Sequence, residues 1–91
     1  MLISPSTRAD KKWMAECDGK KVHVGARGYE DYTIHKDPER RRLYIARHSH
    51  EDYSNPMIAA WLSRYLLWEK PTLSGAIRAA NAEGARARLA S

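Results

Sequence analysis

Alternating apolar and polar positions near the start of the chain predict a β-hairpin. Two short runs, Trp13–Cys17 and Lys20–Val24, flank an Asp18-Gly19 pair, which is typical of a two-residue type I′ turn. A loop of this length fixes the register outward from the turn as Cys17 with Lys20, Glu16 with Lys21, Ala15 with Val22, Met14 with His23 and Trp13 with Val24. The face expected to meet the helices carries Trp13, Ala15, Val22 and Val24.

Helical signals follow in the rest of the chain. Asp37 stands before a proline, a pair that predicts a capped helix over 38–47. Asn55 also stands before a proline and predicts a second helix over 56–68, which is apolar in nearly every direction and belongs in the core or against a second molecule. A third helix, ending near Gly84, is predicted by the i, i+3, i+4, i+7 spacing of Leu73, Ala76, Ile77 and Ala80.

These elements predict an α+β fold in which an N-terminal β-hairpin packs on a three-helix unit. The chain has 91 residues, enough for one modest core. We expect a single small basic α+β domain over 10–84, preceded by an N-terminal arm over 1–9 and followed by a basic C-terminal tail over 85–91. After the hairpin, the glycine-rich connection predicts no regular element and is expected to bury Tyr29, Tyr32 or both.

The net charge indicates the class of partner, and the single cysteine and the lack of a long apolar stretch indicate the compartment. The chain carries 16 Lys and Arg against 11 Asp and Glu, a formal charge of +5, which favours nucleic acid, anionic lipid or an acidic protein over a neutral partner. Cys17 is the only cysteine, so no intramolecular disulfide forms and a reducing intracellular compartment is expected. The N-terminus has no secretory signal pattern, and the apolar stretch 57–68 is shorter than the about 20 residues that cross a bilayer, so no membrane span is expected.

Four arginines surround the first predicted helix. Arg40, Arg41 and Arg42 point about 100° apart, so one flat groove cannot engage them all. Pairing with acids such as Glu30, Asp31 or Glu51 explains them as well as contact with phosphate does, and both interpretations stay open. The candidate anion or nucleic-acid contacts are Arg40, Arg41, Arg42, Arg47, Arg27, Lys20 and Lys21. No nucleic-acid motif of established spacing is present, so base-specific recognition is not expected.

Three aromatic residues share one side of the second predicted helix. Trp61, Tyr65 and Trp68 lie at i, i+4 and i+7. Core packing is the favoured interpretation, and an intermolecular interface or stacking face is the alternative.

The histidines do not form a recognisable metal-binding or catalytic pattern. Three of them, His35, His48 and His50, cluster in sequence, but neither they nor Cys17 with His23 show the ligand spacing of structural zinc sites. Cys17 also has no histidine at a spacing that fixes a general base. We therefore expect no metal, no cofactor, no small-molecule substrate and no enzymatic activity.

The run KKVHVGARGYEDYTIHKDPERRRLYIARH, followed by NPMIAAWLSRYLLWEKPTL, resembles a small uncharacterised protein family encoded mainly by large DNA viruses of eukaryotes. The resemblance covers Trp13 to about Ile77, with GYEDYTIHKDPER, YIARH and LLWEKPTL as its most specific pieces. It implies a viral or virus-derived setting, in a virion or an infected host cell, and it assigns no catalytic residue.

Together these patterns favour a non-catalytic structural or interaction protein. In the setting that the resemblance implies, it would be a virion-associated or minor capsid component whose basic surface contacts acidic partners, other structural proteins or a second copy of itself. The first alternative is a sequence-independent nucleic-acid-binding protein, and the second is a small metal-dependent nuclease.

Overall fold

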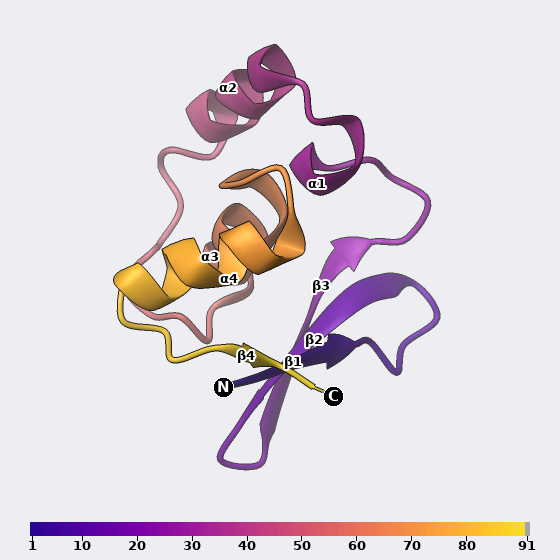
Figure 1. Cartoon of the computed structure of the whole chain (residues 1–91), viewed down its shortest axis with the longest axis vertical. Coiled ribbons are helices and arrows are strands. Elements are labelled where there is room, and N and C mark those ends of the chain that lie inside the picture. The colour runs from indigo at the N-terminus through magenta and orange to yellow at the C-terminus, as the bar shows by residue number, and fades with distance from the viewer. Residues whose placement is uncertain (91) are drawn as a thin grey trace.

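The protein has an α+β fold, as the sequence predicts, with a four-stranded sheet and a layer of helices over one of its faces (Figure 1). The computed structural model describes residues 1–90, and Ser91 of the predicted tail lies outside the described part. In chain order the elements are β1 (Leu2–Pro5), β2 (Lys11–Cys17), β3 (Lys20–Ala26), α1 (Tyr32–His35), α2 (Pro38–Arg47), α3 (Ala59–Ser63), the π-helix η1 (Arg64–Trp68), α4 (Leu73–Ala82) and β4 (Arg88–Leu89).

The β2–β3 hairpin confirms the predicted register at every pair. Asp18 and Gly19 both have positive φ, 50° and 79°, as the two central residues of a type I′ turn require. The predicted inner face does meet the helices: Ala15 and Val24 are buried in the core, and Trp13 and Val22 pack against it. Local turn chemistry therefore determines how this part of the sheet pairs.

The prediction of a separate N-terminal arm over 1–9 is wrong for its first half. Leu2–Pro5 forms β1, which pairs antiparallel with β2 and places Ile3 opposite Ala15. The Ile3 side chain is fully buried. The proline that suggested a loop stands at the end of the strand, where its missing N–H costs little.

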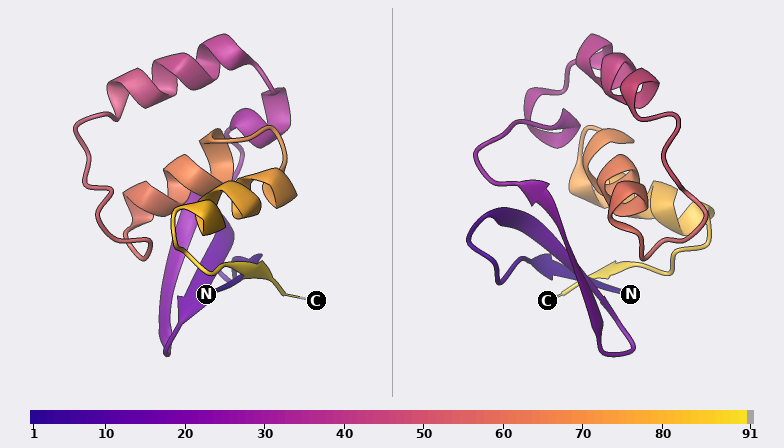
Figure 2. Two further views of the ribbon diagram at one scale, coloured as in Figure 1. Left: turned by 60° about the vertical axis from the view of Figure 1, so that its left-hand side comes forward. Right: turned by 180° about the vertical axis from the view of Figure 1, so that it is seen from behind.

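The predicted basic tail also joins the sheet. Arg88–Leu89 forms β4, which runs parallel to β1 and completes the strand order β3-β2-β1-β4. The Asn81 side chain fixes the backbone just before this strand, because it donates to the Ala87 carbonyl (2.9 Å) and accepts the Ala87 N–H (2.5 Å). The first and last strands, β1 and β4, therefore lie side by side in the sheet, as Figures 1 and 2 show.

Two of the three predicted helices begin where the sequence indicates. The Asp37 carboxylate accepts the Glu39 N–H (3.0 Å) at the start of α2, which ends at Arg47 as predicted. The Thr72 hydroxyl accepts the Gly75 N–H (3.1 Å) at the start of α4. Both caps satisfy N–H groups that have no partner within the helix.

The second predicted helix starts later than expected, at Ala59 instead of Pro56. Asn55 caps only a turn, because its side chain accepts the Met57 N–H (2.9 Å) and its carbonyl accepts the Ile58 N–H (3.0 Å). From Arg64 the backbone widens into η1. The buried residues of α3 and η1 are Trp61, Leu62, Leu66 and Leu67, which form the centre of the core.

The glycine-rich connection after the hairpin, for which the sequence predicts no regular element, leads into the short helix α1. The buried Asp31 carboxylate accepts the Thr33 N–H (2.9 Å) and starts the helix, and Lys36, with φ 55°, ends it. The expected burial of tyrosine here fails at Tyr29, which is 74% exposed, while Tyr32 is half-buried.

Helix α2 lies apart from the other helices, at the opposite end of the molecule from the β2–β3 turn (Figure 1). No residue of α2 is buried, and the helix packs mainly on α1 and η1. Within residues 1–90, none of the helices combines the length and apolar character needed to cross a membrane.

Candidate functional site

The first turn of α2 carries three consecutive arginines, and each meets a different acidic group. Arg40 reaches Glu30 (3.1 Å), and Arg42 pairs with Glu39 one turn back on the same helix. The hydrogen bond from Arg42 holds the pKa of the Glu39 carboxyl below its usual value. Both pairs are about half or more exposed, so their net contribution to folding is small.

Of the three consecutive arginines, Arg41 is the one that connects α2 to another helix. Its Nε donates to the backbone carbonyls of Trp68 (2.9 Å) and Glu69 (3.2 Å), and its terminal nitrogen lies 3.3 Å from the Glu69 carboxylate. These carbonyls end η1, where they have no partner within the helix and where the helix dipole favours a cation. Arg41 therefore fastens α2 to the end of η1.

A continuous stack of rings completes the attachment of α2. The Tyr44 ring lies between Trp68 and His48, at centroid distances of 4.2 Å from both, and Trp68 also contacts His35 at 5.3 Å. Burial in this stack raises the pKa of Tyr44 to about 12. Of the predicted aromatic set, Trp68 thus holds a peripheral helix in place.

The other two predicted aromatics lie toward the core. Trp61 is 4% exposed, and the half-buried Tyr65 stacks on it at 4.3 Å. The Arg64 guanidinium lies over the Tyr65 ring, 5.2 Å from the ring centroid. Both rings are occupied by contacts within the chain, which leaves little open aromatic face for a partner.

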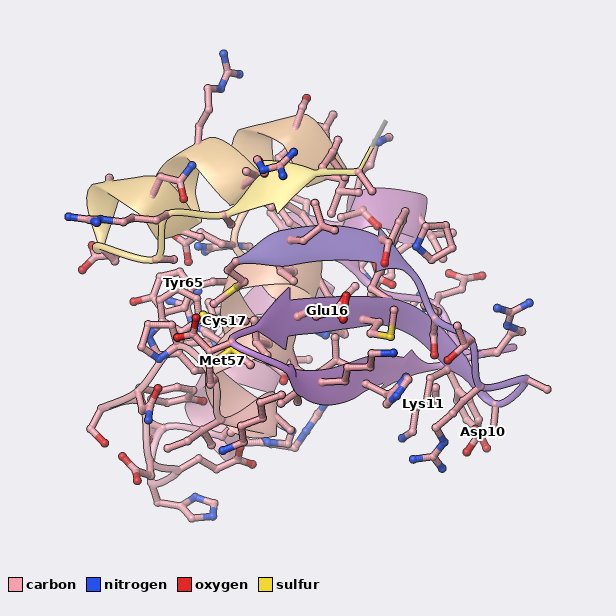
Figure 3. All side chains as sticks on the ribbon, turned by 90° about the horizontal axis from the view of Figure 1, so that it is seen from below. Asp10, Lys11, Glu16, Cys17, Met57 and Tyr65 are labelled. Carbon is pink, nitrogen blue, oxygen red and sulfur yellow. The ribbon has the colours of Figure 1, made fainter. Side chains whose placement is uncertain are left out.

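The seven predicted anion contacts do not form one surface. Lys20 and Lys21 lie beside the β2–β3 turn, and Lys21 faces Glu16 at 3.9 Å. Arg27 follows the other end of the hairpin, about 20 Å away along seven residues of strand. Figure 3 shows the two ends of β2, with Lys11 at one and Cys17 at the other.

A cleft of about 410 Å³ opens between α1 and the end of the hairpin that carries Arg27. We call it the α1 cleft; its lining residues are Lys12, Trp13, Arg27, Asp31, Thr33 and Ile34. Lys12 and Asp31 form its polar part as an ion pair of 2.6 Å, with side chains 16% and 4% exposed. Lys12 also donates to the Tyr29 carbonyl, which ties the loop before α1 to β2.

Arg27 differs from Arg40, Arg41 and Arg42 in what it contacts. Its Nε and one terminal nitrogen donate to the Lys11 carbonyl at 3.3 and 3.1 Å. In the described part of the chain no carboxylate lies within ion-pair distance of Arg27 or of Arg47, both of which are exposed. Of the seven predicted contacts, Lys20, Arg27 and Arg47 therefore keep an uncompensated charge among residues 1–90.

Three of the four large exposed apolar side chains among the described residues belong to the segment 27–47. Among the described residues, the large hydrophobic side chains that are mainly exposed are Tyr29 (74%), Ile34 (54%), Leu43 (40%) and Leu89 (44%). The first three belong to the loop before α1, to α1 and to α2. Sequence reasoning missed them for three reasons. Tyr29 is a candidate for burial in the sequence, Ile34 lies in a helix that the sequence does not predict, and the spacing around Leu43 in a predicted helix does not tell which side faces the solvent.

The histidines predicted as a cluster in sequence take separate structural roles. His35 accepts the Asp37 N–H at Nδ1 (3.0 Å), His48 pairs with Glu51, and His50 is exposed. Within residues 1–90, no group of three His, Cys, Asp or Glu side chains comes close enough to hold a metal ion.

Comparison with known proteins gives one match. Residues 1–48, from β1 to the end of α2, match a family of unknown function (DUF5754), and this is slightly more than half of the chain. No curated protein matches the chain, and no solved structure matches it. The matched segment contains the α1 cleft and the arginines of α2, and the chain belongs to the family DUF5754.

Proposed function

We propose that this protein is a non-catalytic interaction protein that binds an acidic protein partner through the end of the molecule formed by residues 27–47. In the virus-encoded setting that the sequence resemblance implies, it would serve as a virion-associated or minor capsid component. The observation that carries the proposal is the exposure of Tyr29, Ile34 and Leu43 in the same segment as the uncompensated cations Arg27 and Arg47. We refer to these five side chains as the α1–α2 surface.

The composition of the α1–α2 surface supports this function. Protein interfaces are enriched in tyrosine and arginine, and a few apolar anchors surrounded by polar groups supply most of the binding energy. On α2, Leu43 lies three residues after Arg40 and four before Arg47, a spacing that puts all three on one side of the helix. An acidic partner with an apolar residue at its centre complements this arrangement.

The same residues fit nucleic acid less well. Arg40 and Arg42 already pair with Glu30 and Glu39, so these two arginines offer little free charge for a row of phosphate contacts. The lysines beside the β2–β3 turn lie at the far end of the molecule from α2 (Figure 1). A protein that follows a nucleic-acid backbone presents its cations along one continuous groove. These cations are instead divided between opposite ends of the molecule.

A peptide-display selection tests the proposal. Random peptides are selected for binding to the purified protein. The affinity of the selected peptides is then measured for the unchanged protein and for the variants Leu43→Ser and Arg47→Gln. We expect enrichment of Asp or Glu next to an apolar residue and about tenfold weaker binding to either variant, as for loss of an interface anchor.

Matched controls come from other elements of the chain. Leu89→Ser and Arg78→Gln change an exposed apolar residue and an exposed arginine on β4 and α4. Binding should be unchanged in both. Peptides without acidic residues, or equal losses in the controls, would refute the proposed partner.

A further inference from the structure

We propose that the α1 cleft is the anchor pocket of the α1–α2 surface: it takes one apolar side chain of the acidic partner while Arg27 binds a carboxylate next to that side chain. This inference rests on the proposed function and specifies the chemistry of the partner. The ligand is a protein segment in which a branched aliphatic or aromatic residue adjoins an Asp, a Glu or a terminal carboxylate.

The α1 cleft is large enough for an apolar side chain together with the carboxylate next to it. Its volume of about 410 Å³ lies in the range of specific ligand sites, about 300–1,000 Å³. Trp13 from β2 provides a wall that is anchored against the core, and Ile34 from α1 provides a wall that is 54% exposed. An apolar group placed between them would remove the exposed surface of Ile34 from water.

The polar part of the α1 cleft is neutral and already satisfied. The Asp31 carboxylate accepts from Lys12 Nζ at one oxygen, and at the other oxygen it accepts the N–H and the hydroxyl of Thr33. Because the charges of Lys12 and Asp31 cancel, they do not select an anionic or a cationic ligand. They hold β2 and α1 at a fixed separation, which keeps the cleft open without a ligand.

Arg27 supplies the positive charge that selects a ligand with a carboxylate. Its guanidinium is oriented by the Lys11 carbonyl through Nε and Nη2, which leaves Nη1 facing no protein acceptor among residues 1–90. A carboxylate on this nitrogen would gain a charge-assisted hydrogen bond. Because Arg27 is already held in place, less side-chain entropy is lost on binding.

A nucleobase fits this cleft less well than an aliphatic or aromatic side chain of a peptide. Base recognition in single strands depends on flat rings that are open to stacking. Here the open wall is the aliphatic Ile34, and the Trp13 ring is packed against the core. The walls and the single oriented cation together favour a peptide.

Titration with small probes, followed by ¹⁵N–¹H correlation spectra, tests the cleft directly. The probes are N-acetyl-leucine, which carries a carboxylate, and N-acetyl-leucinamide, which does not. We expect shifts of the Thr33, Ile34 and Arg27 amides, with the carboxylate probe binding about tenfold more tightly than the amide. Shifts confined to other residues, or equal binding of the two probes, would overturn the inference.

Three variants make the test specific. Arg27→Gln should abolish the preference for the carboxylate probe, and Ile34→Ser should weaken the binding of both probes. Arg78→Gln, a change of an exposed arginine on α4, should leave both unchanged. Circular dichroism verifies that each variant is folded, and loss of the preference in Arg78→Gln as well would contradict the assignment to Arg27.

The outcome also separates this inference from the proposed function. If selected acidic peptides bind Arg27→Gln as tightly as the unchanged protein, the cleft assignment is wrong while the interaction function stands. If no acidic peptide is selected but N-acetyl-leucine binds in an Arg27-dependent way, the protein partner is refuted and the cleft is a site for a small carboxylate.

Discussion

The Tyr44 ring lies flat on the Trp68 ring, with centroids 4.2 Å apart and planes inclined by only 2°. Tyr44 belongs to the family-matched segment 1–48, and Trp68 to the second half of the chain. This contact, together with the bonds of Arg41, attaches a helix that has no buried residue of its own. The position of the α1–α2 surface therefore depends on a few polar and aromatic contacts.

Loss of the stack should loosen α2 before it unfolds the core. We expect Tyr44→Ala to raise the hydrogen-exchange rates of α2 amides by more than those of α4, because α4 contributes Ala76, Ile77 and Ala80 to the core. Aromatic pairing contributes about 0.5–1.5 kcal/mol beyond burial. Hydrogen exchange read by NMR measures this, and equal acceleration in both helices would contradict a separately attached α2.

The three consecutive arginines should differ in their effect on stability. Arg41→Met removes hydrogen bonds to two carbonyls at the end of η1 and should lower the free energy of unfolding by about 1–2 kcal/mol. Arg42→Met removes only an exposed pair and should cost less than about 0.5 kcal/mol. Urea denaturation of both variants tests this, and similar losses would show that Arg41 has no special structural role.

The first strand should be part of the cooperative unit. Ile3 is fully buried in the core, so Ile3→Ala should lower the free energy of unfolding by about 2–5 kcal/mol. Thr7→Ala, in the exposed loop after β1, is the matched control and should cost little. Urea denaturation compares the two; a loss below about 1 kcal/mol for Ile3→Ala would mean that β1 is not integral to the core.

The elements that sequence predicts well are those determined by neighbouring residues. Asp18-Gly19 sets the hairpin register because the turn itself requires positive φ at both positions. Asp37 likewise caps α2 through the N–H groups that follow it. In both cases the interaction partners lie within a few residues, so the pattern contains the whole physical cause.

The missed elements depend on partners that are distant in the chain. Arg88–Leu89 has no strand pattern of its own and becomes β4 only because β1, almost the whole chain away, offers an open edge. The α1 cleft is equally non-local, because Lys12 and Asp31 meet only after the hairpin and α1 have packed. Arg27 was identified from its charge, but its orientation by the Lys11 carbonyl has no signature in the sequence.

High pH should destabilise the protein through Tyr44. Its pKa is raised from 10.0 to about 12 by burial, so the folded state keeps the phenol proton that the unfolded state loses near pH 10. The contribution of the neutral phenol is fully present below pH 10 and is lost as the pH rises to about 12. Tyr44→Phe should lack this loss, so the stability difference between the two proteins should change between pH 9 and about 11.5 in urea denaturation; a constant difference would contradict the buried phenol.

The most direct test of an acidic protein partner is a comparison of ligand classes on one sample. Fluorescence anisotropy is measured for labelled duplex DNA, labelled single-stranded RNA and a selected acidic peptide at about 50 and 200 mM salt, while light scattering reports the oligomeric state. We predict saturable binding of the peptide, reduced by Leu43→Ser and Arg27→Gln, and no comparable binding of either nucleic acid. Tight nucleic-acid binding by the monomer that falls tenfold or more over this salt range, with a shallower dependence in Arg40→Gln and Arg42→Gln, would contradict the account.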